Sequence, residues 1–403
     1  MNHRRYYTDS YTRQFTTQVA ATTSLNGSCA AILEETFFYP TSGGQPHDTG
    51  RLGSAGVVNV VLRETDGAVL HLLDAPLPPG RAVEGRIDWP RRFDHMQQHT
   101  GQHILSQAFE RMAQAPTIGF HLGAERVSID LGVPALSDSQ LADVEALANE
   151  VVSANAAVRA WFPDPAELRA LALRKQPDVS GALRVVAIGD FDFSACGGTH
   201  VATTAEVGLI AVLRTERLKR GVRVEFLCGG RARSDYTRKH AILRDLSGAL
   251  TCAPAELGAS LLRLQESLQE TRRELAVHQE RALDAEAVRL LELATSHGAL
   301  RVVRAGWTER PVDELKALAL RLTSGPDCVA LLGSAGSRTQ LLFARSENLP
   351  LDLKPAFQLT LESLGGGRGG GARIWQGGAG PSDLETLERG LVAAELLVVG
   401  GGE

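Results

Sequence analysis

Two short segments far apart in the chain carry the residues best suited to chemistry. His99 and His103 occupy positions i and i+4 of the first segment, and Cys196 and His200 occupy the same spacing in the second. Together they offer three imidazoles and one thiolate, a donor set suited to Zn²⁺ in tetrahedral geometry. Two histidines at this spacing are common on helices. Both pairs in one chain, with the second reading Cys-Gly-Gly-Thr-His, indicate a metal site.

The number of residues that bind would decide what such a site can do. With all four bound, the ion is closed off, as in a structural zinc site. With three bound, one position stays open for water or substrate. The sequence is compatible with both arrangements.

This pairing resembles the editing domain of alanyl-tRNA synthetase and its free-standing relatives, the AlaX-type trans-editing proteins. Residues 38–50, which read FYPTSGGQPHDTG, resemble the glycine-rich stretch that precedes the editing core in the long forms. Residues 117–123 and 128–131 resemble the strand segment that closes the editing pocket. The glycine-rich residues 365–371 and 376–378 resemble the C-terminal module that the synthetase shares with DHH-type phosphoesterases. The resemblance therefore spans residues 38 to 378.

The resemblance implies a stand-alone aminoacyl-tRNA deacylase that acts in trans. Its expected substrate is tRNA(Ala) mischarged with serine, with the glycine ester as a second candidate. The alternative from another class is a non-catalytic, zinc-containing tRNA-binding protein. A zinc peptidase is disfavoured, because the first histidine pair lacks the glutamate that serves as the general base in HExxH enzymes.

Several pocket residues follow from the resemblance. Thr117 is expected to contact the serine side chain or the attacking water, and Gln102 is expected to line the pocket beside the ligands. Gly43, Gly44 and Gln45 are expected to bind substrate and to help separate serine from alanine. On residue type alone, Thr117 could be an ordinary strand-edge threonine, and the glycine pair could be a hairpin turn.

Two further residues belong to this set of expectations. Arg368 lies in the C-terminal glycine tract, whose backbone amides could cradle phosphate, although a flexible linker would have the same composition. His95 extends the histidine row by one more helical turn. Because the family motif starts at His99, we expect His95 behind the ligands or on the surface.

The composition of the chain limits the classes of protein to which it can belong. A net charge of −5 argues against a nonspecific nucleic-acid coat, but local patches can still bind tRNA. One such patch joins five basic residues and is as compatible with a solvated face as with an RNA contact: Arg214, Arg217, Lys219, Arg220 and Arg223. No apolar run is long enough to span a membrane, and five scattered cysteines form no disulfide framework. These features predict a cytoplasmic protein.

The elements that must position these residues form an α+β, multidomain chain. Residues 1–90 contain five short alternating runs and are predicted to form a small β-barrel. Residues 91–232 are predicted to form the zinc-binding editing domain, with one helix from Arg91 and another capped by Ser137. Residues 233–298 read as a helical arm in which leucines follow coiled-coil spacing. Residues 299–403 read as an α/β, DHHA1-like module. We expect the C-terminal half to bind tRNA or to form a homodimer.

Overall fold

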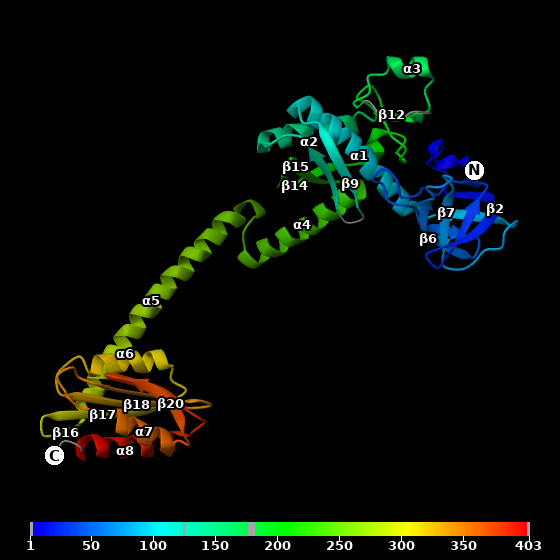
Figure 1. Ribbon diagram of the computed structural model, residues 1–403. Coiled ribbons are helices and arrows are strands. Elements are labelled where there is room, and N and C mark those ends of the chain that lie inside the picture. Colours follow the sequence, from blue (N-terminus) through cyan, green and yellow to red (C-terminus); the bar gives the residue numbers. More distant parts are fainter. Residues whose placement is uncertain (1–2, 124–125, 176–181, 401–403) are drawn as a thin grey trace. The chain divides into compact units, whose positions relative to one another are not determined.

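The computed structural model describes residues 3–123, 126–175 and 182–400. The chain is α+β and divides into two units, Met1–Ala249 and Leu250–Glu403, whose elements are labelled in Figure 1. The expected multidomain α+β fold is therefore confirmed. The finer division into four parts stays a prediction.

The first unit begins with a closed, six-stranded barrel. Its strand order is β2 (Gln14–Leu25), β3 (Ser28–Leu33), β7 (Val69–Leu73), β6 (Ala55–Leu62), β5 (Gly50–Leu52) and β8 (Ala82–Ile87). Five of these strands match the alternating runs in the sequence. The sixth, β5, has only three residues, which is too few to show alternation. The barrel also buries His71, whose ring contacts Thr36 Oγ1 at 2.8 Å and the Ala31 carbonyl oxygen at 3.1 Å.

Helix α1 (Trp89–Ala113) leads from the barrel to the predicted metal ligands. Asp88 caps it by accepting a hydrogen bond from the Arg91 backbone N–H, so the helix starts two residues before Arg91. Arg92 anchors this end of the helix to the barrel domain. Its side chain is fully buried, and its Nε lies 2.9 and 3.0 Å from the two carboxylate oxygens of Asp48.

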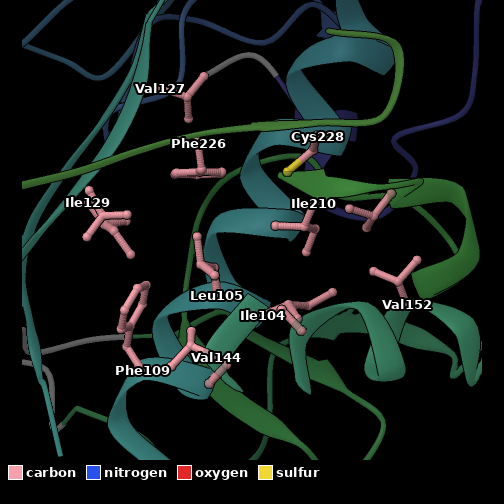
Figure 2. Close-up of a cluster of buried hydrophobic side chains, with 14 of the residues drawn as sticks. Ile104, Leu105, Phe109, Val127, Ile129, Val144, Val152, Ile210, Phe226 and Cys228 are labelled. Carbon is pink, nitrogen blue, oxygen red and sulfur yellow. The ribbon is translucent and has the colours of Figure 1, made fainter. Parts of the chain in front are cut away.

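A four-stranded antiparallel sheet packs against α1. Its order is β14 (Ile210–Leu218), β15 (Gly221–Cys228), β10 (Val127–Leu131) and β9 (Thr117–Leu122). Helix α2 (Asp138–Ser153) joins the same core and starts with a capping box between Ser137 and Gln140, which confirms the expected cap. Figure 2 shows the shared core, where Ile104, Leu105 and Phe109 of α1 lie among side chains from α2, β10, β14 and β15.

A second, three-stranded sheet leads into the Cys196 loop. It pairs β11 (Val158–Trp161), β12 (Val185–Ile188) and β13 (Asp192–Ala195) in sequence order. A short helix, α3 (Pro165–Ala170), follows β11. Because Cys196 directly follows β13, this sheet sets the position of the second ligand pair.

The predicted helical arm is two helices. Helix α4 (Gly229–Leu250) ends before a 3₁₀ turn at Pro254–Glu256, and α5 (Leu257–Glu292) follows. Proline lacks a backbone N–H and interrupts helical hydrogen bonding, which accounts for a break at this point. The coiled-coil leucines lie on α5, where Leu261, Leu264, Leu268 and Leu275 are 50–56% exposed. They therefore form no coiled coil within the described part of the chain.

The second unit contains a six-stranded sheet with helices on both faces (Figure 1). The order is β16 (Thr295–His297), β17 (Leu300–Thr308), β18 (Cys328–Ala335), β19 (Thr339–Arg345), β21 (Ile374–Ala379) and β20 (Gly367–Gly371). Helix α6 (Val312–Leu322) shares one core with α5. Helices α7 (Lys354–Ser363) and α8 (Leu384–Gly400) share the other.

The glycine tract that could have been a phosphate-binding loop or a linker is the edge strand β20. Its residues are exposed and pair with β21, so that Gly369 lies opposite Gly377. This glycine pair lies over the Phe357 ring: a Cβ atom would lie 2.7 Å from the ring at Gly369 and 2.9 Å from it at Gly377. Across the described residues, no helix has both the length and the apolar character needed to span a bilayer.

Candidate metal centre

The structure brings the four predicted ligands together. His99 and His103 come from α1, and Cys196 and His200 come from the loop after β13. Their ligand atoms all lie within 4.8 Å of one another, and the Cys196 Sγ lies 3.4 Å from Nε2 of both His99 and His200. Tetrahedral zinc ligands are roughly 3.3–3.8 Å apart. The cluster therefore has the size and the donor chemistry of a site for one metal ion.

Each of the three histidines is held through its other ring nitrogen. The Nδ1 atoms of His99, His103 and His200 lie 2.8, 3.2 and 3.1 Å from Gln45 Oε1, Asp192 Oδ2 and Thr100 Oγ1. Such partners orient metal-binding imidazoles and select the tautomer that leaves the other nitrogen free. Arg174 supports this arrangement by donating from Nε to Asp192 Oδ1 at 2.9 Å. In all three rings, Nε2 is thus left to face the centre.

The Cys196 loop is held by two buried side chains. Arg184 donates from Nη1 to the carbonyl oxygens of Cys196 and Gly198, both at 2.9 Å. Gln45 accepts from the Thr199 backbone N–H at 3.1 Å and donates to the Thr199 hydroxyl at 2.8 Å. Gly198 lets the loop approach His99, since a Cβ there would lie 2.1 Å from the imidazole ring. All these contacts constrain the second ligand pair.

The protonation of the cluster follows from its burial and from its internal charges. Burial alone would raise the pKa of Cys196, but the His99 and His200 imidazoles outweigh it and hold this pKa well below its usual value. Burial lowers the pKa of His200 to about 3. Burial also acts to lower the pKa of His103, but Asp192 and Cys196 raise it to about 9. A bound metal ion would displace that proton.

His95 lies on α1 one turn before His99, yet it is not part of the cluster. Its side chain is only 3% exposed, so it is not a surface residue. Burial lowers the pKa of His95 to about 4, and its Nδ1 has no hydrogen-bond partner among the described residues. His95 is thus a buried neutral imidazole outside the cluster of four ligands.

The Gly43–Gly44 segment lies beside the cluster as a tight turn. Ser42 and Gln45 exchange backbone hydrogen bonds of 3.1 and 2.9 Å, and both glycines have positive φ, as a type I′ turn requires. A Cβ on Gly44 would lie 2.5 Å from the Phe120 ring. That ring is 39% exposed and its centroid lies 6.1 Å from that of His99. The turn and Phe120 therefore flank the cluster.

Thr117 and Gln102 are joined through a residue that the sequence did not single out. Thr117 Oγ1 and Gln102 Nε2 both donate to the buried Ser106 hydroxyl, each at 2.8 Å. Gln102 is 2% exposed and adjoins His103 in sequence. Its Oε1 has no hydrogen-bond partner in the described part of the chain. Ser106 thus ties strand β9 to the helix that carries the first ligand pair.

The sequence also did not reveal the supporting roles of Asp192 and Arg184, because these depend on contacts made only in the fold. Asp192 lies four residues before Cys196, and nothing in that spacing marks it as a partner of His103. The side-chain polar atoms of Gln45, which is expected to bind substrate, contact His99 and Thr199. Arg368 lies on β20 of the second unit and is exposed.

Comparisons with known proteins agree with this site. Residues 183–225, which include Cys196 and His200, match the family described as threonyl and alanyl tRNA synthetase second additional domain. The chain is 33% identical to the alanyl-tRNA editing protein Aarsd1 of Rattus norvegicus, over 67% of this chain and 71% of that protein. It is 29% identical to the alanyl-tRNA editing protein AlaX-L of Pyrococcus horikoshii, over 94% of each chain.

The similarity extends to a larger enzyme and to one solved structure. The chain is 32% identical to the alanine–tRNA ligase of Pyrococcus abyssi over 92% of its own length, but it spans only 41% of that ligase. The C-Ala domain of Aquifex aeolicus alanyl-tRNA synthetase aligns with 25% of this chain and 96% of its own, at 20% identity. The TM-score of that alignment is 0.22.

Proposed function

We propose that this chain, a member of the alanyl-tRNA editing protein family, hydrolyses the ester of tRNA(Ala) mischarged with serine and, more slowly, with glycine. The observation that carries this proposal is the cluster of three imidazoles and one thiolate, together with the hydrogen-bonded residues Thr117, Ser106 and Gln102, of which Gln102 directly precedes the ligand His103. A metal-ligand set and a fixed hydroxyl are groups with which an ester hydrolase can hold substrate and water.

We propose Zn²⁺ as the metal. Three imidazoles and one thiolate are the ligand types that zinc prefers, and the partnered outer nitrogens give the ligands a fixed orientation. When bound, zinc would supply a Lewis acid that polarises an ester carbonyl, activates water or anchors the substrate.

Thr117 is proposed to recognise the side-chain hydroxyl of the serine ester by a hydrogen bond. Its own hydrogen goes to Ser106 at 2.8 Å, so its oxygen remains an acceptor. A serine hydroxyl can donate to that oxygen, whereas alanine would leave it unpaired, and sites that hydrogen-bond a substrate hydroxyl reject analogues that lack it. Gln102 Oε1, which also lacks a donor, is proposed to accept from the substrate's ammonium group or from water.

One observation favours a second candidate, a zinc-containing tRNA-binding protein without catalytic activity. All four donors converge on one centre, and an ion that bound all four would have no open position. Under this alternative the metal holds α1 and the Cys196 loop together, and the chain binds tRNA without hydrolysing it.

Deacylation assays separate the two candidates. Purified protein is incubated with Ser-, Gly- and Ala-tRNA(Ala), with and without a chelator, and its metal content is measured in parallel. We expect about one zinc per chain and hydrolysis of the serine ester far faster than that of the alanine ester. Thr117→Val should lower the rate while metal content stays unchanged. Full zinc content with no hydrolysis of any ester would favour the non-catalytic alternative, and equal rates on serine and alanine would exclude editing.

We also propose that the second unit serves tRNA binding, with Arg368 as one contact, or self-association. Exposed Arg368 on β20 and the exposed leucines of α5 support these roles. Sedimentation of the full chain, alone and with tRNA(Ala), tests both. A monomer whose affinity for tRNA is unchanged by Arg368→Gln would contradict both assignments.

A further inference from the structure

The predicted basic patch is divided in two by the fold. Its residues lie on the hairpin of β14 and β15, where Arg214 pairs with Glu225 at 2.8 Å and Arg223 pairs with Asp130 at 2.7 Å. Among the described residues, no carboxylate lies within 4.0 Å of a basic nitrogen of Arg217, Lys219 or Arg220. We call these last three the basic tip. All three are exposed at the turn of the hairpin.

The basic tip borders a hollow in the surface. Its three residues line a cavity of about 290 Å³ together with Leu218, Gly221 and the segment from Gly132 to Pro134. Glu216 is the acidic residue nearest in sequence, but it lies on the opposite face of β14 from Arg217. Its negative charge instead helps to raise the pKa of Arg214 and of Arg223. No acidic side chain lines this cavity, so its charged lining is positive.

The strand register connects the basic tip to the proposed editing pocket. Arg217 pairs with Val222, Val222 pairs with Leu131, and Leu131 pairs with Thr117. These four residues form one row across the sheet. Neighbouring strands are about 4.8 Å apart, so the backbones of Arg217 and Thr117 are about 14 Å apart along this row. The rim of the cavity is also tied to the Thr117 segment, because the Gly132 N–H donates to the Pro116 carbonyl at 2.9 Å.

We propose that the basic tip binds backbone phosphates in the single-stranded 3′ end of the aminoacylated tRNA. This inference rests on the proposed function, in which the 3′-terminal ester reaches Thr117. A strand whose last nucleotide lies at Thr117 carries its preceding phosphates within reach of the basic tip. Unpaired arginine and lysine side chains attract such a polyanion, whereas Arg214 and Arg223 are already neutralised.

Binding by two RNAs tests the assignment independently of hydrolysis. The full-length protein and a variant combining Arg217→Gln, Lys219→Gln and Arg220→Gln are titrated with uncharged tRNA(Ala) and with the same tRNA lacking its single-stranded 3′ nucleotides. The matched control is Arg214→Gln, which removes an exposed but paired arginine from the same strand. Kd is measured over a range of salt concentrations.

We expect the triple variant to weaken binding of intact tRNA about tenfold and to lower the slope of log K against log salt by about two, since each single-strand phosphate contact contributes about 0.7. On truncated tRNA, the triple variant and the wild type should bind equally. Arg214→Gln should match the wild type on both RNAs. An equal loss on intact and truncated tRNA, or an equal loss from Arg214→Gln, would overturn the proposal. A wild type that binds both RNAs as expected but hydrolyses no ester would instead contradict the proposed function alone.

Discussion

The Nδ1 atom of His103 lies 3.2 Å from Oδ2 of Asp192, and this contact joins helix α1 to strand β13 beside the four candidate metal ligands. Asp192 is buried and also accepts from Arg174 and from the Ser194 hydroxyl. Burial alone would raise the pKa of Asp192, but its hydrogen bond to His103 and the nearby positive charges hold this pKa below its usual value. Asp192 therefore remains an anion and fixes one ligand in place.

Replacing this carboxylate should weaken metal binding without removing a ligand. We expect Asp192→Asn to lower the affinity for zinc by about 10- to 100-fold, as is usual when the partner of a metal-binding histidine is lost. Competition with a chromophoric chelator measures the change. Asp190→Asn is the matched control, because Asp190 is exposed two residues earlier. Equal affinities for the two variants would mean that Asp192 does not orient His103.

The turn beside the cluster offers a matched pair of glycines. Both Gly43 and Gly44 have positive φ, so alanine strains the backbone at either position. Only at Gly44 would the added Cβ collide with the Phe120 ring. We expect Gly44→Ala to lower the deacylation rate more than Gly43→Ala, with metal content unchanged. Adding Phe120→Ala to Gly44→Ala should recover part of the loss. The same rate for both alanine variants would show that strain, and not the Phe120 contact, matters.

His71 should make the barrel sensitive to acid. Burial lowers the pKa of His71 to about 4 in the folded chain, against about 6.5 when unfolded. The unfolded state therefore binds the proton more tightly, and stability is lost as the pH falls from about 6.5 towards 4. The full effect amounts to about 3 kcal/mol.

The test is the melting temperature of the wild type and of His71→Gln between pH 7 and pH 4. We expect the variant to lose less stability than the wild type over this interval, whatever its stability at pH 7. Parallel pH profiles would show that His71 is not the group that titrates. Comparison with the wild type also subtracts the contribution of His95, whose pKa is similarly low.

The Arg92–Asp48 pair should contribute strongly to stability, because both side chains are fully buried. We expect Asp48→Asn to destabilise the protein by about 3–5 kcal/mol, since it leaves Arg92 buried without a counter-charge. Denaturant unfolding followed by fluorescence measures this. Asp66→Asn, which breaks the exposed Arg63–Asp66 pair, should have no measurable effect. Similar losses from both changes would contradict the special role of the buried pair.

Local patterns predicted much of the fold. Alternation located five barrel strands, and the Ser137 cap located α2. Elements with weak local signals were missed. Strand β5 is too short to alternate, and the glycine tract has almost no side chains from which a strand could be recognised.

The residues of the candidate site were likewise only partly predictable from the sequence. The four ligands were predictable, because two pairs of histidine and cysteine at metal-ligand spacing in one chain are typical of a metal site. Asp192, Arg184 and Ser106 act on residues that only the folded chain brings near them, so their types and spacing carried no signal. The neutralisation of Arg214 and Arg223 likewise depends on Glu225 and Asp130, which lie across the sheet.

The Phe357 ring packs against Gly369 and Gly377, and this contact has a consequence for the pairing of β20 with β21. A strand made almost entirely of glycine has no side-chain pattern to stop it from sliding along its neighbour. The Phe357 ring instead restricts the partner strand β21, because it leaves no room for a side chain at Gly377. A shift of β21 by two residues would bring Trp375 or Ala379 over that ring. The aromatic side chain of α7 therefore holds β21, the strand with which β20 pairs, in one position.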